Sequence, residues 1–84
     1  MRITFKLFAQ LTDYLPVEAR HTNVIDIDAD PQATINQIIE PFQLPPKLVH
    51  LVLLNGTYIA PAQRATQTLQ PGDVLAIWPP IAGG

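Results

Sequence analysis

The chain has 84 residues, of which 48% are hydrophobic and 14% are charged, a length and composition that suit one domain with a single core. Its formal net charge is −2 and its five Lys and Arg residues are scattered, which argues against a nucleic acid or an anionic membrane as a partner. The absence of cysteine excludes disulfides, thiolate metal sites and a thiol nucleophile in this sequence. The sequence shows no signal-peptide core, and no apolar run approaches the roughly 20 residues of a membrane helix, so we expect a cytoplasmic protein.

Two strands are predicted in the first third of the chain. Ile3, Phe5 and Leu7 alternate with polar residues, which is the period-2 pattern of a half-buried strand. The alternation returns from residue 23 to residue 29, and the aspartates of this second strand are expected to point outward. Between the two strands, residues 10–14 have helical spacing, but the proline that follows predicts only a short turn or helical piece.

One short helix is predicted after the second strand. Thr34 and Gln37 fit a capping box, in which the threonine oxygen accepts a hydrogen bond from the third helical amide and the glutamine side chain reaches back. Apolar residues follow at helical spacing, so one face of the helix should lie on the sheet: Ile35, Ile38, Ile39 and Phe42. Because Pro41 lacks an amide hydrogen, the helix is limited to about two turns.

A β-hairpin is predicted in the second half of the chain. Residues 51–54 and 57–59 have the character of strands, and they flank Asn55-Gly56. Asn-Gly is the strongest short hairpin signal, because both residues tolerate positive φ in a type I′ turn. Residues 60–70 are expected to form a loop with at most one helical turn.

The last strand is predicted over residues 74–78, after a turn at 71–73. The order strand, strand, helix, strand, strand, strand favours an α+β sheet with one helix packed across a face. The third strand is apolar on both of its faces, since it consists of Leu51, Val52, Leu53 and Leu54. Its second face either docks a partner or is covered by loops, and the low charge content favours the partner.

No constellation of catalytic or metal-binding residues is predicted. The aspartates of residues 26–30 have the spacing that opens a calcium loop, but Pro31 and Gln37 stand where such a loop needs glycine and glutamate. We interpret these aspartates as a solvated acidic edge. His21 and His50 have no second ligand at metal spacing, and the chain contains no serine. No nucleotide-binding loop is present, so any ATP used must be bound by another protein.

The sequence ends in a tail that differs from the predicted domain. We expect the domain to span residues 1–78 and a flexible, extended tail to span residues 79–84, because two prolines hold the chain extended after the last strand. The tail ends in Gly83-Gly84. A terminal glycine has an unhindered carboxylate, and such a tail can thread a narrow channel in another protein.

This tail, after a hydrophobic strand that ends in an aromatic residue, resembles those of the ubiquitin-like sulfur carriers, and most closely the small subunits of molybdopterin synthases. Residues 3–9 are similar to the first strand of that family and to the phenylalanine-alanine step that follows it. Residues 69–74 are similar to the family's Gly-Asp turn into the last strand. The resemblance implies a β-grasp, or ubiquitin-like, fold with a mixed five-stranded sheet, in which the first and last strands lie parallel at the centre. Carriers for thiamin biosynthesis are related.

The resemblance also implies a function and its partners. A ubiquitin-activating-like adenylyltransferase, using ATP and Mg²⁺, would adenylate Gly84, and a sulfurtransferase would convert it to a thiocarboxylate. The thiocarboxylate would donate sulfur in molybdopterin biosynthesis, so the protein would be a carrier with no catalysis and no bound cofactor or metal of its own. The tail would enter the large subunit of the synthase through Trp78, Pro79, Pro80, Ile81, Ala82 and Gly83.

Two alternatives remain open at this stage. A sulfur carrier for thiamin thiazole, or for another sulfur-containing product, would have the same tail. A ubiquitin-like modifier would instead be joined to lysines of other proteins through Gly84.

Overall fold

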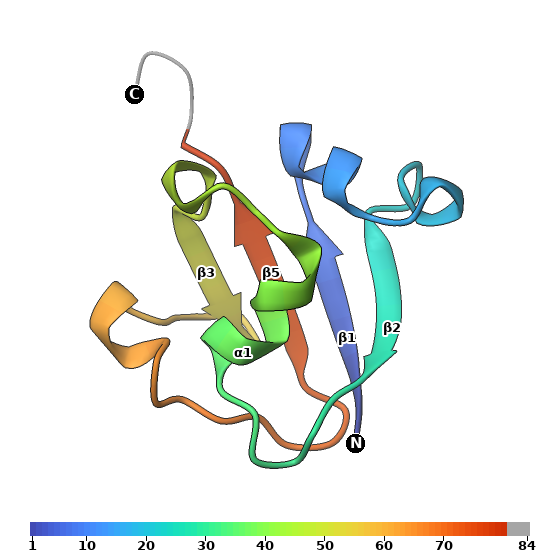
Figure 1. Cartoon of the computed structure of the whole chain (residues 1–84). Coiled ribbons are helices and arrows are strands. Elements are labelled where there is room, and N and C mark those ends of the chain that lie inside the picture. Colours follow the sequence, from blue (N-terminus) through green and yellow to red (C-terminus); the bar gives the residue numbers. More distant parts are fainter. Residues whose placement is uncertain (81–84) are drawn as a thin grey trace.

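The computed structural model describes residues 1–80. They form a five-stranded sheet in the order β2-β1-β5-β3-β4, with helix α1 packed across one face (Figure 1). The elements are β1 (Arg2–Leu7), β2 (Val24–Asp28), α1 (Ile35–Ile39), β3 (Leu51–Leu54), β4 (Thr57–Tyr58) and β5 (Val74–Trp78). The central strands β1 and β5 are parallel and the other neighbours are antiparallel. This mixed sheet with one main helix is the β-grasp arrangement that the resemblance implied.

Strands β1 and β2 form because their side chains alternate between the core and the opposite face. Ile3, Phe5 and Leu7 are buried, as the period-2 pattern predicted. Asp26 and Asp28 are exposed on β2, which confirms their outward orientation. Asp30 lies beyond the end of β2, where its carboxylate accepts a hydrogen bond from the Gln32 backbone N–H at 2.8 Å. The acidic strand face therefore contains two of the three aspartates.

Short 3₁₀ segments fill the connection between β1 and β2. They span Ala9–Tyr14 and Val17–Ala19, in agreement with the predicted short helical piece. Ala9 has a φ of +53°, which turns the chain away from the end of β1. The buried side chains of Leu11 and Leu15 attach this connection to the core.

Helix α1 begins at the capping box that the sequence predicted. The Gln37 N–H donates to Thr34 Oγ1 at 3.3 Å, and the Thr34 N–H donates to Gln37 Oε1 at 2.9 Å. The helix turns its buried isoleucines onto the sheet: Ile35, Ile38 and Ile39. After Ile39 the backbone tightens into a 3₁₀ turn, Glu40–Phe42, because Pro41 cannot continue the α-helical hydrogen bonds.

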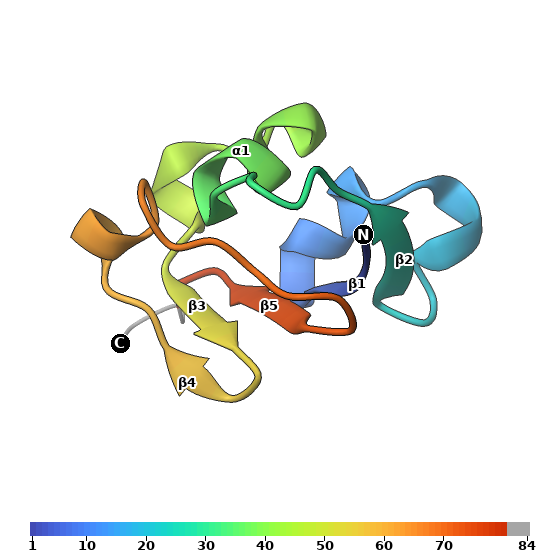
Figure 2. The ribbon, with the colours of Figure 1, turned by 90° about the horizontal axis from the view of Figure 1, so that it is seen from below.

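The β3-β4 hairpin has the Asn-Gly turn expected from the sequence, with φ values of +51° at Asn55 and +84° at Gly56. A single 3₁₀ turn, Pro61–Gln63, interrupts the following loop. Figure 2 shows α1 over one face of the sheet, and the described part of the chain places no helix over the other face. Within residues 1–80, no helix is long and apolar enough to cross a membrane.

Candidate functional site

The C-terminal end of β5 is held on both sides by hydrogen bonds. On the β1 side, the Phe8 N–H donates to the Ile77 carbonyl at 3.2 Å. On the β3 side, the His50 N–H donates to the Trp78 carbonyl at 3.2 Å. The chain therefore leaves the domain from a central strand that is paired up to its last residue.

An aromatic stack covers this exit. The rings of Phe8 and Trp78 lie parallel, with 4.1 Å between centroids and 1° between planes. Trp78 was predicted from the sequence as part of the tail site, whereas Phe8 was not. The signal available for Phe8 was the phenylalanine-alanine step after the first strand. Phe8 and Trp78 are far apart in the sequence. They come together because the parallel strands β1 and β5 end side by side.

Two prolines carry the chain away from the stack. Pro79 is buried and Pro80 is exposed, so the chain reaches the surface at Pro80. The other tail residues assigned from the sequence, Ile81, Ala82, Gly83 and Gly84, lie outside the described residues. The expected flexibility of the tail concerns these residues and is not tested by the structure.

The register of β3 separates the four residues of the predicted sheet-face interface into two pairs. Val52 is opposite Ile77 and is fully buried, and Leu54 packs against the same core. These two side chains face α1 and cannot form an outer interface. Leu51 and Leu53 are opposite Trp78 and Ala76 and point to the helix-free face, where both are half-buried.

The helix-free face of the sheet has an apolar half and a polar half. The apolar half, called here the apolar strip, consists of Leu51, Leu53, Tyr58, Val74, Ala76 and Trp78. Tyr58 is 51% exposed on this strip, whereas Ala76 is only 7% exposed. The polar half lies over β1 and β2 and includes an ion pair between Arg2 and Asp28 at 3.2 Å. The apolar strip extends to Trp78 and is therefore continuous with the chain exit.

Arg64 supports the segment that precedes β3, a role that was not predicted from the sequence. Its side chain is 5% exposed and donates to the carbonyls of Ile59 at 3.0 Å, His50 at 3.2 Å and Val49 at 3.5 Å. His50 in turn donates its N–H to Trp78, so Arg64 braces one side of the exit. No sequence pattern marks an arginine whose acceptors are backbone carbonyls.

The described residues offer no metal centre. Within residues 1–80, no group of three or more His, Asp or Glu side chains is placed to hold a metal ion. His21 and His50 are both exposed, at separate places in the fold.

The sheet order, the single main helix and the exit of the chain from a central strand define a ubiquitin-like β-grasp protein. Residues 1–82 match the family model described as Mut7-C ubiquitin, and the chain belongs to this family. No curated protein matches the chain.

Solved structures with the same fold include both modifiers and molybdopterin proteins. SAMP1 from Haloferax volcanii is 25% identical, with a TM-score of 0.65 over 100% of both chains. The Haloferax volcanii protein HVO 2177 is 23% identical, with a TM-score of 0.75 over 100% of this chain and 87% of that one. A complex of subunits 1 and 2 of the molybdopterin-converting factor from Helicobacter pylori contains a chain that is 20% identical, with a TM-score of 0.63 over 100% of both chains.

Proposed function

We propose that this protein is a cytoplasmic sulfur carrier for molybdopterin biosynthesis and has no catalytic activity of its own. The observation that carries the proposal is the exit of the chain at Trp78 to Pro80. The central strand β5 is hydrogen-bonded on both sides and is followed by Pro79-Pro80. After these prolines the sequence continues as Ile-Ala-Gly-Gly. A rigid domain with a slender glycine end suits a group that is activated in one protein and delivered into another.

The chemistry requires activation because a free carboxylate is a poor acyl donor. An adenylyltransferase would join the Gly84 carboxylate to AMP from ATP, releasing pyrophosphate, with Mg²⁺ bound by that enzyme. Sulfide supplied by a sulfurtransferase would then form the C–S bond as the bond to AMP breaks. The product is a thiocarboxylate at Gly84, and burial of the tail in the partner shields it from water.

The apolar strip is the proposed docking surface for these partners. It borders the exit, so a partner that covers Leu51, Leu53 and Trp78 would also receive the tail. The Helicobacter pylori protein is a complex of subunits 1 and 2 of a molybdopterin-converting factor, which supports a large synthase subunit as one such partner.

A second candidate function is protein modification. The likeness to SAMP1, at 25% identity over the whole of both chains, favours it, because SAMP1 is named as a small archaeal modifier protein. In this reaction a lysine amine of a target would attack the acyl carbon of adenylated Gly84, and the amide bond would form as the bond to AMP breaks and AMP leaves.

The carrier proposal is tested at Gly84. Incubated with its activating enzyme, ATP, Mg²⁺ and a sulfur source, the parent should gain the mass of one oxygen-to-sulfur exchange, and fragmentation should place it at Gly84. Deletion of Gly84 should abolish the gain, and Gly84→Ala should reduce it, since a narrow active site leaves no room for a Cβ. Gln63→Ala, an exposed change in the 3₁₀ turn Pro61–Gln63, is the matched control and should react like the parent. Sulfur transfer from the shortened chain would overturn the proposal.

A second experiment separates the pathways. Protein recovered from its native cell should co-purify with a molybdopterin synthase large subunit if it serves that pathway. Proteins carrying the chain on lysine, detected as gel-shifted conjugates that depend on Gly84, would favour the modifier. A thiazole-forming partner would instead assign the carrier to thiamin biosynthesis.

A further inference from the structure

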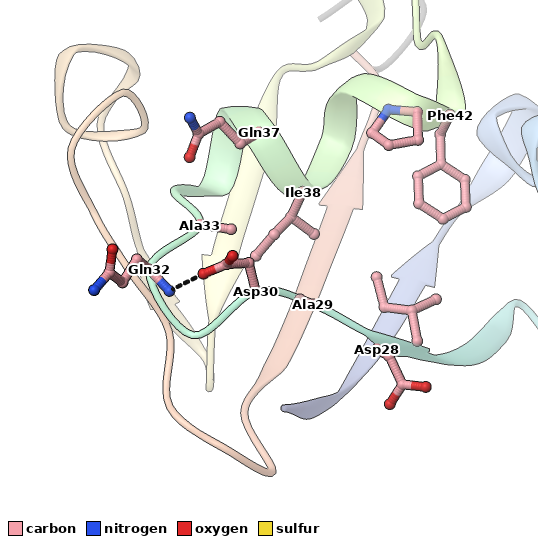
Figure 3. A pocket seen from close by; sticks show the side chains of 10 residues that line it. Asp28, Ala29, Asp30, Gln32, Ala33, Gln37, Ile38 and Phe42 are labelled. Carbon is pink, nitrogen blue, oxygen red and sulfur yellow. Dashed lines mark hydrogen bonds between the residues drawn. The ribbon is translucent and has the colours of Figure 1, made fainter.

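A groove lies between helix α1, strand β2 and the segment that joins them (Figure 3). It is on the helix side of the sheet, opposite the apolar strip. Its volume is about 730 Å³, and it is open to solvent along one side. Apolar side chains of Ile27, Ala29, Ile38 and Phe42 line it. Asp30 and Gln32 stand at its rim, joined by the hydrogen bond from the Gln32 N–H. Such a groove is suited to receive apolar side chains from an extended chain.

Among the described residues, the strand beside this groove has an unpaired edge. Strand β2 is the first in the sheet order, and within residues 1–80 it pairs with β1 alone. Ala29 exchanges two hydrogen bonds with Met1, at 2.8 and 2.7 Å, so in an antiparallel ladder the odd-numbered residues of β2 face β1. The N–H and C=O groups of Asp26 and Asp28 therefore point away from the sheet, and within residues 1–80 they have no backbone partner.

The charges along this edge restrict what can pair with it. Asp26 and Asp28 are exposed on the helix-free face, and Asp30 is exposed at the groove. Arg2 is the single cation within salt-bridge distance of these carboxylates in the described residues. A second copy of the same edge would place aspartates opposite aspartates, which is unfavourable, whereas lysine or arginine side chains would be attracted.

We propose that the β2 edge binds an extended peptide in which basic and apolar residues alternate. The peptide would add as a further strand, with its backbone paired to Asp26 and Asp28. Alternate side chains of a strand point to opposite faces, so its apolar residues would enter the groove near Ile27 and Ile38 while its basic residues approach the aspartates. The proposal does not depend on sulfur transfer, and strand β1 separates β2 from β5 in the sheet.

Amide hydrogen exchange on the complete chain tests the backbone pairing. The probe is a blocked peptide of alternating lysine and valine, seven residues long. On addition of this peptide the amides of Asp26 and Asp28 should exchange more slowly, while those of Ile25 and Ile27, already paired to β1, should change little. A peptide with glutamate in place of lysine should not bind, nor should the lysine peptide with alternate backbone nitrogens methylated.

Protein variants test the same contacts from the other side. The double change Asp26→Asn and Asp28→Asn should weaken binding on the order of tenfold, because both opposite-charge pairs are lost. Asp26→Pro should abolish binding by removing an outward N–H that the β1 ladder does not use, whereas Asp26→Ala retains it. Asp13→Asn, an exposed change outside the groove, is the control and should bind like the parent.

Three outcomes would overturn the proposal. In the first, the N-methylated peptide binds as tightly as the unmodified lysine peptide. In the second, amide exchange slows in the apolar strip and does not change at Asp26 and Asp28. In the third, the lysine peptide does not bind at a concentration of about 1 mM. If Asp26→Pro does not fold, the N-methylated peptide decides the question on the unchanged protein.

Discussion

Arg64 is a charged residue with a structural position inside the fold. Burial of a guanidinium is unfavourable unless its donors find acceptors, and three backbone carbonyls supply them here. Its Cζ also lies 6.0 Å from the centroid of the Tyr58 ring. Because two of the carbonyls belong to Val49 and His50, the side chain fixes the entry into β3 and, through His50, the end of β5.

We expect Arg64→Ala to lower the free energy of unfolding by about 3 kcal/mol, because one buried and two partly buried carbonyls lose their donors and a cavity remains. Urea unfolding followed by the fluorescence of Trp78 measures this. Arg20→Ala is the matched control, since the exposed Arg20 side chain donates to the Leu15 carbonyl at 3.0 Å. The control should cost about 1 kcal/mol or less. Equal losses in the two variants would contradict the structural role of Arg64.

At the scale of secondary-structure elements, the Asn-Gly turn does more than reverse the chain. The Asn55 side chain accepts a hydrogen bond from the Val74 N–H at 2.8 Å and donates to the Asp73 carboxylate at 2.9 Å. The turn thereby attaches the β3-β4 hairpin to the start of β5. Gly56 contributes only its conformation, because a Cβ at this position would meet no atom within 4 Å.

Gly56→Ala should destabilise the protein by about 1 kcal/mol, since the +84° φ is strained for any residue with a Cβ. Asn55→Gly keeps the positive φ accessible but removes both side-chain hydrogen bonds, so it separates the two roles of the turn. Denaturant unfolding of both variants measures these effects. An unchanged midpoint for Gly56→Ala would show that the turn has adopted another conformation.

At the scale of the whole molecule, the sheet separates two surfaces. The apolar strip and the chain exit share the helix-free face over β5, β3 and β4, whereas the groove beside β2 lies on the helix side. The two faces of β3 accordingly differ in their contribution to stability. Val52 belongs to the core, while Leu51 and Leu53 are available to a partner.

Changing Leu51 and Leu53 to lysine should leave the thermal midpoint nearly unchanged and abolish pull-down of the activating enzyme, because only the apolar strip becomes charged. The matched variant changes Val52 and Leu54 to lysine and should unfold the domain, since a buried unpaired charge lowers the free energy of unfolding by about 3 kcal/mol or more. Differential scanning calorimetry and pull-down measure the two effects. The docking hypothesis fails if the Leu51 and Leu53 variant also unfolds.

The predictions from sequence that the structure confirms depend on local physics. Strand alternation, the Thr34 capping box, the arrest of the helix at Pro41 and the Asn55-Gly56 turn each involve residues within a few positions of one another. The order of the strands in the sheet came instead from the family resemblance, because pattern alone supports any α+β sheet with one helix.

The sequence by itself determined the strands, the main helix and their order along the chain, since periodicity, capping and turn conformation are encoded by near neighbours. Only the tertiary structure decided which leucines of β3 face outward, because that depends on the register between β3 and β5. It also stacked Phe8 on Trp78, surrounded Arg64 with backbone carbonyls and, within residues 1–80, left the edge at Asp26 unpaired. These features arise from contacts between residues distant in the chain, and chain order alone does not specify such contacts.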